Sequence, residues 1–382
     1  MKILLRGYYG WGNLGDDVLM IVVYNWLRKQ FPQARIDIFS GFTKNNAACK
    51  PNLHDYHNYI HTLLPEKPQI VDWAHKEHYN LLVQGGGGVH FDHSHGGTTY
   101  SLLNSVIKTI GAGAVTATEN LVRKAASKKL NISFDKKIGL GIGVGDFTAD
   151  GKGLLAHASK IGEYNFIWVR DDLSVSWLKK LKFSGKVIRA SDLAFATEAW
   201  LPKTEISNNN KSIGFVTLNK DTQSPAEYEA QCRLLSDLQK EGYSVKVYLF
   251  QEVVDKKLLP MFKQVAPVAL WQPQKQSLNQ YLSDLGSNSL LISGRAHGVI
   301  LGACMGIPSI TLETSSKLRE VSAMFPETSA LIPSTQDSKK VIALVNDMFC
   351  RLPEIKNKLT AEVEANRKKV MTAFAQTRDQ IN

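Results

Sequence analysis

An arginine and a histidine two residues apart form the segment of this sequence best suited to chemistry. Arg295 and His297 follow the apolar residues 290–292, which are typical of a strand buried on both faces. Arginine binds carboxylates and phosphates through paired N–H groups, and histidine exchanges protons near neutral pH. Open parallel sheets bind ligands beyond the carboxyl ends of their strands. Either residue could be structural by itself, but the pair predicts a site for a small anionic substrate.

A second arginine follows another predicted strand. Residues 166–169 are apolar and lead to Arg170, directly before a helical pattern. Asp171 or Asp172 suits the N-cap of that helix, and Arg170 either pairs with one of them or points into a cleft. For Asp192, which lies just before a polar break in the chain, a structural cap is the favoured role.

A glycine-rich loop follows the first predicted strand. Gly10, Gly12 and Gly15 have the spacing of a dinucleotide-binding loop, but no acidic residue ends the second strand, where a ribose would require one. Glycines at this position let the backbone approach a ligand closely. Asp16 or Asp17 is expected to cap the following helix. The loop therefore predicts ligand contact but gives no strong signal for a nucleotide cofactor.

Aromatic residues and a second glycine run extend the predicted ligand surface. Tyr8, Tyr9 and Trp11 are expected to be exposed, which suits stacking against a sugar ring. Residues 85–88 are four consecutive glycines at the exit of a predicted strand. Four glycines in a row are costly in backbone entropy, so ligand approach is favoured over a flexible turn.

Histidines are concentrated around this glycine run. Eight of the ten lie between His54 and His95. His90, Asp92, His93 and His95 could hold a metal ion, but their spacing fits no standard zinc pattern. We therefore predict no metal, and expect His90 or His95 to contact a substrate hydroxyl.

Strands and helices alternate along the chain in two series. This order predicts two Rossmann-like α/β domains with parallel sheets facing a cleft, and 382 residues exceed what one core usually supports. The polar residues 201–211 separate the series, so we place the N-terminal domain at 1–203 and the C-terminal domain at 204–382. The predicted strands are 2–6, 34–40, 80–84, 137–143, 166–169, 186–188, 213–218, 244–250, 290–293 and 309–312. The predicted helices are 16–30, 101–128, 173–181, 226–240, one from about 296, and a closing helix, 355–374, that packs across both halves.

Composition limits the partners and the location. The net charge of +11 suits nucleic acid, an anionic membrane surface or small anionic substrates. The basic residues are scattered and no nucleic-acid signature is present, so nucleic acid is not expected. Four widely spaced cysteines fit reduced thiols, and no segment reads as a signal peptide or a membrane span. We expect a cytoplasmic protein, with peripheral attachment to the inner face of the membrane left open.

Five motifs in order resemble the polysaccharide pyruvyl transferase family. They are residues 12–16, the glycines 85–88, Val169-Arg170-Asp171 with Ser174, residues 192–195, and Arg295-Ala296-His297 with residues 306–310 and Lys317. The resemblance spans nearly the whole chain to about Lys317. It implies a fold of GT-B type and transfer of the pyruvyl group of phosphoenolpyruvate onto a sugar of a polysaccharide or its precursor. The product would be a cyclic pyruvate ketal, with phosphate released.

The resemblance also implies roles for single residues. Arg170 and Arg295 would bind phosphoenolpyruvate, His297 would be the general acid, and Lys317 matches a basic position of the family. No cofactor is implied beyond the donor substrate. The acceptor would be a sugar or glycan, free or lipid-linked, as in the biosynthesis of exopolysaccharide and cell envelope. Further substrate-binding residues are expected to be Gly12, Asn13, Gly87 and His95.

Elementary chemistry agrees with these roles. Phosphoenolpyruvate carries a carboxylate and a phosphate, which two arginines and a helix N-terminus can bind. Protonation of its methylene carbon requires a cationic imidazole, yet Arg295 and the helix N-terminus oppose a charge on His297. We therefore expect the negative charge of the substrate to raise the pKa of His297.

Two other functions are compatible with the sequence. A GT-B nucleotide-sugar glycosyltransferase would need a carboxylate in the second half to bind the ribose or base, and Glu313 is the candidate. A non-catalytic anion- or glycan-binding protein would not need a histidine beside Arg295. The motifs and the pairing of Arg295 with His297 favour the pyruvyl transferase.

Overall fold

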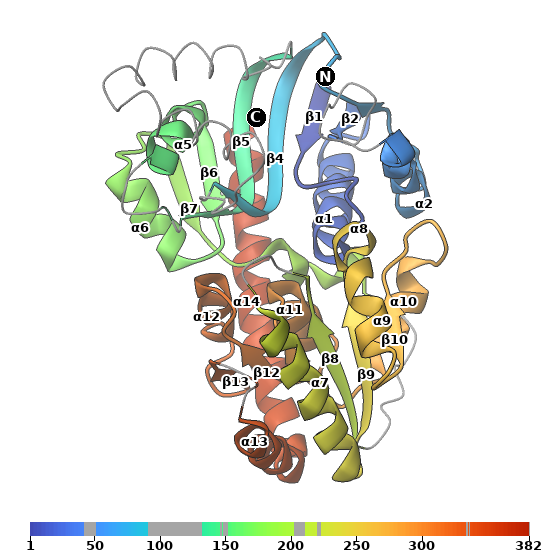
Figure 1. The fold of residues 1–382 in the computed structure, drawn as a ribbon. Coiled ribbons are helices and arrows are strands. Elements are labelled where there is room, and N and C mark those ends of the chain that lie inside the picture. The colour runs from blue at the N-terminus through green and yellow to red at the C-terminus, as the bar shows by residue number, and fades with distance from the viewer. Residues whose placement is uncertain are drawn as a thin grey trace, which may run out of the picture.

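Two parallel β-sheets, one from each half of the chain, organise the fold (Figure 1). The computed structural model describes residues 1–41, 51–90, 132–145, 147, 152–201, 211–219, 223–333, 335 and 337–381. Every strand pairing within the two described sheets is parallel. Parallel neighbours need long crossover connections, usually helices, so the predicted alternation of strands and helices is confirmed. The boundary expected at 203/204 falls within residues 202–210, outside the described ranges, and stays a prediction.

The first sheet has seven strands in the order β3-β2-β1-β4-β5-β6-β7. The chain turns back at β1, because β2 and β3 lie on one side of it and β4 on the other. The crevice at such a switch point is where open α/β sheets bind ligands. The strands are β1 (Lys2–Arg6), β2 (Arg35–Phe39), β3 (Ile70–Val71), β4 (His78–His90), β5 (Ser133–Val144), β6 (Phe166–Val169) and β7 (Lys186–Arg189).

The second sheet has six strands in the order β10-β9-β8-β11-β12-β13, with its switch point between β8 and β11. The strand before Arg295 is therefore one of the two that flank this point, as the motif of Arg295 and His297 predicted. The strands are β8 (Ser212–Thr217), β9 (Ser244–Leu249), β10 (Val268–Leu270), β11 (Leu290–Ser293), β12 (Ser309–Leu312) and β13 (Ser329–Ile332).

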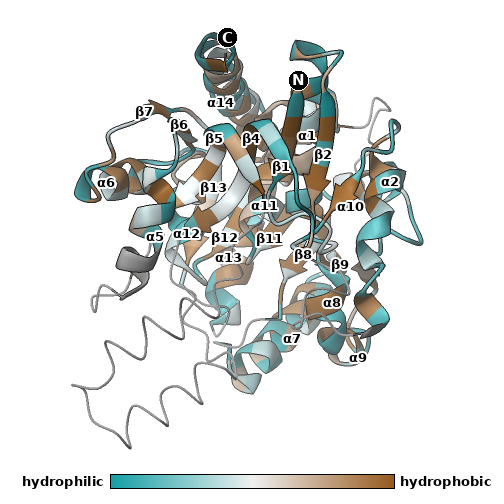
Figure 2. Cartoon of the chain, turned by 90° about the horizontal axis from the view of Figure 1, so that it is seen from above, coloured by the Kyte–Doolittle hydropathy of each residue, from teal (hydrophilic) through white to brown (hydrophobic). Residues whose placement is uncertain are grey.

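Helices connect the strands and cover the sheets, and apolar residues gather on the strands and inward helix faces (Figure 2). None of the described helices is long and apolar enough to cross a membrane. The longer helices are α1 (Leu14–Gln30), α5 (Lys152–Gly162), α6 (Asp172–Lys180), α7 (Pro225–Lys240), α10 (Leu278–Gly286), α11 (Ala296–Cys304), α12 (Ser316–Ser322), α13 (Ser338–Cys350) and α14 (Leu352–Ile381). Short helical turns are η1 (Pro51–Leu53), η2 (Tyr56–Tyr59), α2 (Ile60–Leu63), η3 (Leu193–Phe195), η4 (Thr197–Ala199), α8 (Glu252–Asp255), η5 (Lys256–Leu258) and α9 (Leu259–Phe262).

Several elements were missed from the sequence, including the helix α5. β3, β10 and β13 have two to four residues each, too few for an alternating pattern to stand out. The helices α10, α12 and α13 were also not predicted. The helix expected at 101–128 lies outside the described residues.

The start of α1 differs from the expectation. Asn13 is the N-cap, because its side chain accepts a hydrogen bond from the Gly15 amide at 3.2 Å. The helix therefore begins at Leu14, and the prediction that Asp16 or Asp17 caps it is wrong. Both aspartates lie inside the first turn, where a carboxylate interacts favourably with the helix dipole.

The glycine run lies within a strand instead of in a turn. β4 continues through it to His90, and Gly87 pairs with Ile142 of β5. The strand was expected to end before the glycines, with ligand approach favoured over a flexible turn, because glycine usually weakens strands; instead α1 packs directly on these residues. A Cβ atom on Gly85 would overlap Tyr9, and one on Gly86 would overlap Leu19. The run thus lets the first helix and the sheet approach closely.

The last helix returns to the first half of the chain, as expected of a closing helix (Figure 1). Phe374 of α14 stacks on Trp26 with ring centroids 5.0 Å apart and meets Trp168 edge-on at 5.1 Å. Asn366 accepts a hydrogen bond from the Ser191 hydroxyl at 2.9 Å. α14 also contacts α11 and α13 of the second half, so it packs against both halves.

Replacing Phe374 with alanine should destabilise the protein by about 3–5 kcal/mol, because a buried ring between two tryptophans is lost. Urea unfolding followed by tryptophan fluorescence measures the change. Met371→Ala on the same helix is the control, since Met371 is 44% exposed and should change the free energy of unfolding by less than about 0.5 kcal/mol. Equal losses in the two variants would show that α14 does not anchor the halves through Phe374.

Candidate active site

The carboxyl ends of the two sheets meet beside the first glycine loop. The Leu14 amide donates a hydrogen bond to the Phe250 carbonyl at 2.9 Å, and Asn13 forms an antiparallel bridge with Gln251. The Gln251 side chain donates to the Tyr8 hydroxyl at 3.3 Å. Since these residues follow β1 and β9, the ligand-binding edges of both halves face one another.

Arg170 lies at the end of β6 and is 3% exposed. Its Nη1 donates to Asp192 Oδ2 at 2.9 Å, and its Nε lies 3.5 Å from Asp171 Oδ2. Burial acts to lower the pKa of Arg170, but Asp192, Asp171 and Asp16 outweigh it and raise this pKa. A Cβ on Gly143 would lie 3.5 Å from the guanidinium, so this glycine of β5 leaves room beside the arginine.

Arg295 lies at the N-cap position of α11 and is held by three contacts. Its Nη2 donates to Asp255 Oδ2 at 2.5 Å, and its Nε donates to the Thr217 carbonyl at 3.2 Å. The guanidinium carbon lies 5.9 Å from the centre of the Phe250 ring. Asp255 is fully buried and also accepts from the amides of Asn219 and Gln251. The orientation of Arg295 is therefore fixed by buried partners.

His297 lies in the first turn of α11 with 14% of its side chain exposed. Its Nε2 is buried and has no hydrogen-bond partner among the described residues; Asp192 Oδ2 lies 3.9 Å away. The ring packs against Gly15 of α1, where a Cβ would overlap it. Burial lowers the pKa of His297 to about 4, Asp192 acts to raise it, and Arg170, Arg295 and Lys317 lower it further.

Asp192 lies between predicted site residues of the two halves. It caps η3 by accepting from the Ala194 amide at 3.0 Å, as its predicted structural role required. The same fully buried carboxylate contacts Arg170 and lies beside His297. The sequence did not reveal this second role, because a capping role alone accounts for an aspartate at this position. Only the contact between halves shows that it also belongs to the site.

Lys317 lies on α12 and lines a pocket together with Arg170. The pocket is bounded by the backbone of residues 143–145 and by the first turn of α6, with Glu320 at its side. Lys317 also lowers the pKa of His297 electrostatically. Cationic side chains from both halves thus approach one small pocket.

The acceptor-side residues predicted from the sequence fall in two groups. Gly12 and Asn13 lie at the start of α1, where the Gly12 amide donates to the Tyr59 hydroxyl at 2.8 Å. Gly87 lies in β4, and a Cβ there would come within 2.9 Å of Asp16 Oδ1. His95 lies outside the described residues, together with Asp92 and His93, so its expected contact stays a prediction.

His90 lies at the end of β4 in a buried aromatic setting. Its Nδ1 is 3.1 Å from His157 Nδ1, and its Nε2 is 3.1 Å from the Tyr164 hydroxyl. Burial lowers its pKa to about 3, and His157 adds to the effect. Both ring nitrogens are therefore occupied by protein partners, and the expected contact of His90 with a substrate hydroxyl has no support here.

The predicted aromatic surface is smaller than expected. Tyr8 is 43% exposed and stacks on Trp11 with centroids 5.1 Å apart and ring planes 8° from parallel. Tyr9 is buried at 1% exposure, so its predicted exposure is wrong. Its ring fills the space above Gly7 and Gly85, which is a packing role.

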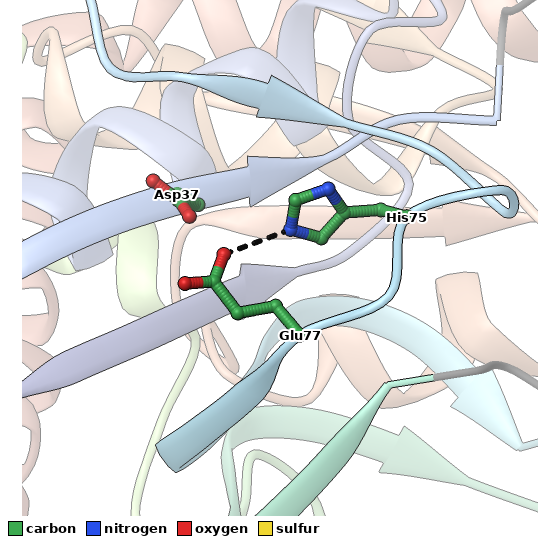
Figure 3. A group of neighbouring side chains, drawn as sticks. All are labelled: Asp37, His75 and Glu77. Carbon is green, nitrogen blue, oxygen red and sulfur yellow. Dashed lines mark hydrogen bonds and ion pairs between the residues drawn. The ribbon is translucent and has the colours of Figure 1, made fainter.

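A group with metal-ligand chemistry lies elsewhere, near the amino ends of the first sheet. Asp37, His75 and Glu77 have ligand atoms within 4.8 Å of one another (Figure 3). Arg35 binds Asp37 at 2.6 Å and Glu77 at 2.9 Å. Hydrogen bonding to Lys2 and then His75 lowers the pKa of Glu77 to about 2, although burial opposes the shift. Two cationic residues already neutralise these carboxylates, so the group is an ion-pair network.

The fold is shared with solved structures of epimerases and a glycotransferase. The UDP-GlcNAc 2-epimerase from Neisseria meningitidis matches with a TM-score of 0.56 and 11% identity, covering 99% of each chain. The corresponding enzyme from Methanocaldococcus jannaschii gives 0.54 and 13%, covering 91% of this chain and 93% of that one. The glycotransferase of kitacinnamycin gives 0.51 and 10%, covering 100% and 99%. At such identities the likeness shows the fold alone.

Fold and site together define a two-domain α/β protein of GT-B type, as the sequence predicted. Residues 13–316 match the family described as polysaccharide pyruvyl transferase, and the chain therefore belongs to that family. The match includes Asn13, Arg170, Arg295 and His297, and ends just before Lys317. No curated protein sequence matches the chain.

In the free protein, the imidazole of His297 should be neutral near neutral pH. Burial and three cations lower its pKa from 6.5 to about 4, so nitrogen NMR of the labelled ring should show titration only in the acid range. A His297→Gln variant identifies the signal. A midpoint at the ordinary value of 6.5 would show that the ring is solvated instead of enclosed between the halves.

Proposed function

We propose that the protein transfers the pyruvyl group of phosphoenolpyruvate to a sugar of a polysaccharide or its precursor. The product is a cyclic pyruvate ketal, and phosphate is released. The observation that carries this proposal is the buried, unpartnered Nε2 of His297, beside Arg170 of one half and Arg295 of the other. Unsatisfied buried polar groups are rare and commonly have a functional reason.

Binding of the donor rests on charge. Phosphoenolpyruvate brings a carboxylate and a phosphate, and Arg170, Arg295 and Lys317 supply three cations around one region. Asp192 and Asp255 fix the two guanidinium groups, so little side-chain order must be gained on binding. The N-terminus of α11 adds backbone N–H groups and a favourable dipole.

Protonation of the donor requires a charged imidazole. In the free protein the pKa of His297 is about 4, because of burial and nearby cations. A bound trianion offsets those cations and raises this pKa, so that His297 is charged in the complex. The imidazolium then delivers a proton to the methylene carbon, and C2 becomes cationic for attack by a sugar hydroxyl. Asp192 stabilises the charged ring from 3.9 Å.

The acceptor approaches from the glycine loop and β4. The backbones of Gly12, Asn13 and Gly87 are near this side of the site, and the half-exposed Tyr8 on Trp11 offers a flat face for a sugar ring. We also assign His95 to acceptor contact. The acceptor is a glycan, free or lipid-linked, in exopolysaccharide or cell-envelope synthesis. The protein acts in the cytoplasm or at the inner face of the membrane.

The proposed reaction needs no cofactor, because its atoms balance without one. Two sugar hydroxyls lose their protons: one proton becomes the third hydrogen of the ketal methyl group and the other leaves on hydrogen phosphate. The methylene carbon is reduced and C2 is oxidised by the same amount, so the donor undergoes no net oxidation or reduction. The reaction is an addition followed by a displacement, for which acid–base groups and cationic side chains are sufficient.

A nucleotide-sugar glycosyltransferase is the competing assignment on this fold. It would use Glu313 to bind a ribose or base, but Glu313 is engaged by an ion pair with Arg319. A binding protein without activity is the other alternative, and it would not release phosphate. Mass spectrometry of the product decides, since a pyruvate ketal and a transferred hexose add different masses.

Incubation with phosphoenolpyruvate and a panel of glycan acceptors should release phosphate. His297→Gln should lower kcat by about 10²–10⁴-fold and retain donor binding. Arg170→Lys and Arg295→Lys keep the charges beside Asp192 and Asp255 but lose the planar fork, so the KM for phosphoenolpyruvate should rise. Calorimetry measures binding and phosphate release measures turnover. Full turnover in His297→Gln would assign the acid to another residue.

A methyl group added at Gly15 should disturb the acid without unfolding the protein. Alanine favours helices over glycine by about 1 kcal/mol, but its Cβ would overlap the His297 ring. Displacement of that ring should lower kcat by about 10²-fold. Gly162→Ala in α5 is the control, since nothing lies within 4 Å of the added Cβ. Unchanged turnover in Gly15→Ala would show that the position of His297 is not critical.

A further inference from the structure

A second buried carboxylate faces the same site and has no role in the function proposed above. Asp16 lies in the first turn of α1, is 8% exposed, and follows Gly15, against which His297 packs. Its Oδ1 lies over Gly87 of β4, where any side chain would crowd it. Among the described residues, no hydrogen-bond donor contacts its carboxylate. At 8% exposure the carboxylate is not fully enclosed, so a ligand can reach it and supply the missing hydrogen-bond donor.

The adjacent aspartate has a similar pKa, which burial also raises to about 7, but its contacts differ. Asp17 accepts hydrogen bonds from the Tyr59 hydroxyl at 2.6 Å and from Trp271 Nε1 at 2.9 Å. Both of its oxygens are therefore occupied, and Trp271 belongs to the second half, so Asp17 links the halves structurally. The two aspartates share a helix turn and burial, but only the carboxylate of Asp16 is available to a substrate.

The electrostatic surroundings place Asp16 beside the donor site. Burial, followed by the charge of Asp17, raises the pKa of Asp16 to about 7, while Arg170 and then Arg295 act to lower it. Asp192 raises it as well. A carboxylate with a pKa near neutrality can take up and return a proton at working pH, and its charge interacts with both arginines of the proposed donor site.

We propose that Asp16 is a further catalytic residue, whose carboxylate accepts the proton of the sugar hydroxyl that attacks C2 of the donor. This inference rests on the proposed function. Asp16 lies against Gly87, where there is no side chain, while His297 packs against the preceding residue, Gly15. The site then holds an acid for the methylene carbon and a base for the acceptor.

Each proton transferred in this step has a donor and an acceptor. His297 gives a proton to the methylene carbon, and the hydroxyl oxygen forms a bond to cationic C2 while its proton passes to Asp16. The bond between C2 and the phosphate oxygen then breaks, and the oxygen of the second hydroxyl bonds to C2 and closes the ketal. Of the two hydroxyl protons, one restores His297 and one leaves on hydrogen phosphate. The carboxylate is thereby regenerated.

Asp16→Asn should lower the rate of phosphate release by about 10²–10⁴-fold, since the amide has the size of the carboxylate but cannot accept the proton. Phosphoenolpyruvate binding, measured by calorimetry, should be unchanged or tighter, because a charge that repels the trianion is removed. A fall in turnover with undiminished donor affinity separates this role from general damage to the site. Unchanged turnover, or lost donor binding, would overturn the proposal.

The matched control is Asp17→Asn, on the same helix turn. Loss of an acceptor for Tyr59 or Trp271 should lower its melting temperature while its turnover falls much less than that of Asp16→Asn. The pH profile gives a second readout: the rise of wild-type kcat with ionisation of Asp16 should be absent from the residual activity of Asp16→Asn. Equal turnover losses in the two variants, or an unchanged profile, would refute the role. If the wild type releases no phosphate with any acceptor, the proposed function itself fails.

Discussion

The site depends on one buried carboxylate shared between the halves of the chain. Asp192 is fully buried, binds Arg170 at 2.9 Å and lies 3.9 Å from Nε2 of His297. Without it, the guanidinium of Arg170 would be buried without its closest counter-ion, which is strongly unfavourable. The same carboxylate acts to raise the pKa of His297 and so favours a charge on the imidazole. The same side chain therefore stabilises the first half and orients the chemistry of the second.

Charge is balanced in pairs around this carboxylate. Arg170 is paired with Asp192, and Arg295 is paired with the buried Asp255. Such pairing orders each guanidinium before a ligand arrives and still leaves N–H groups for it, which is the preorganisation that an active site requires. The arrangement also explains why His297 is neutral in the free protein: its pKa falls with burial and with the cations beside it. In the proposed function, the anionic donor supplies the missing counter-charge.

The fold was predictable from the sequence where strands are apolar and helices long. β6, β11 and β12 were located closely because each is a short apolar run bounded by polar or glycine residues. The glycine run in β4 was misjudged, because these glycines are required for the close approach of α1 to the sheet and do not form a local turn. Tyr9 was misjudged for the same reason, since its ring fills the space that those glycines leave. Such packing has no signature in local periodicity.

The sequence by itself determined the alternation of strands and helices, the two-sheet organisation, and the cationic and imidazole groups at strand ends, because these follow from local pattern and residue chemistry. Tertiary structure decided which of those groups meet. It placed Asp192 beside His297 and Asp255 beside Arg295. Within the described part of the chain, it gave Asp17 two hydrogen-bond donors and Asp16 none. Burial and neighbouring charges set the proton affinity of each group, and both arise only when distant segments pack together.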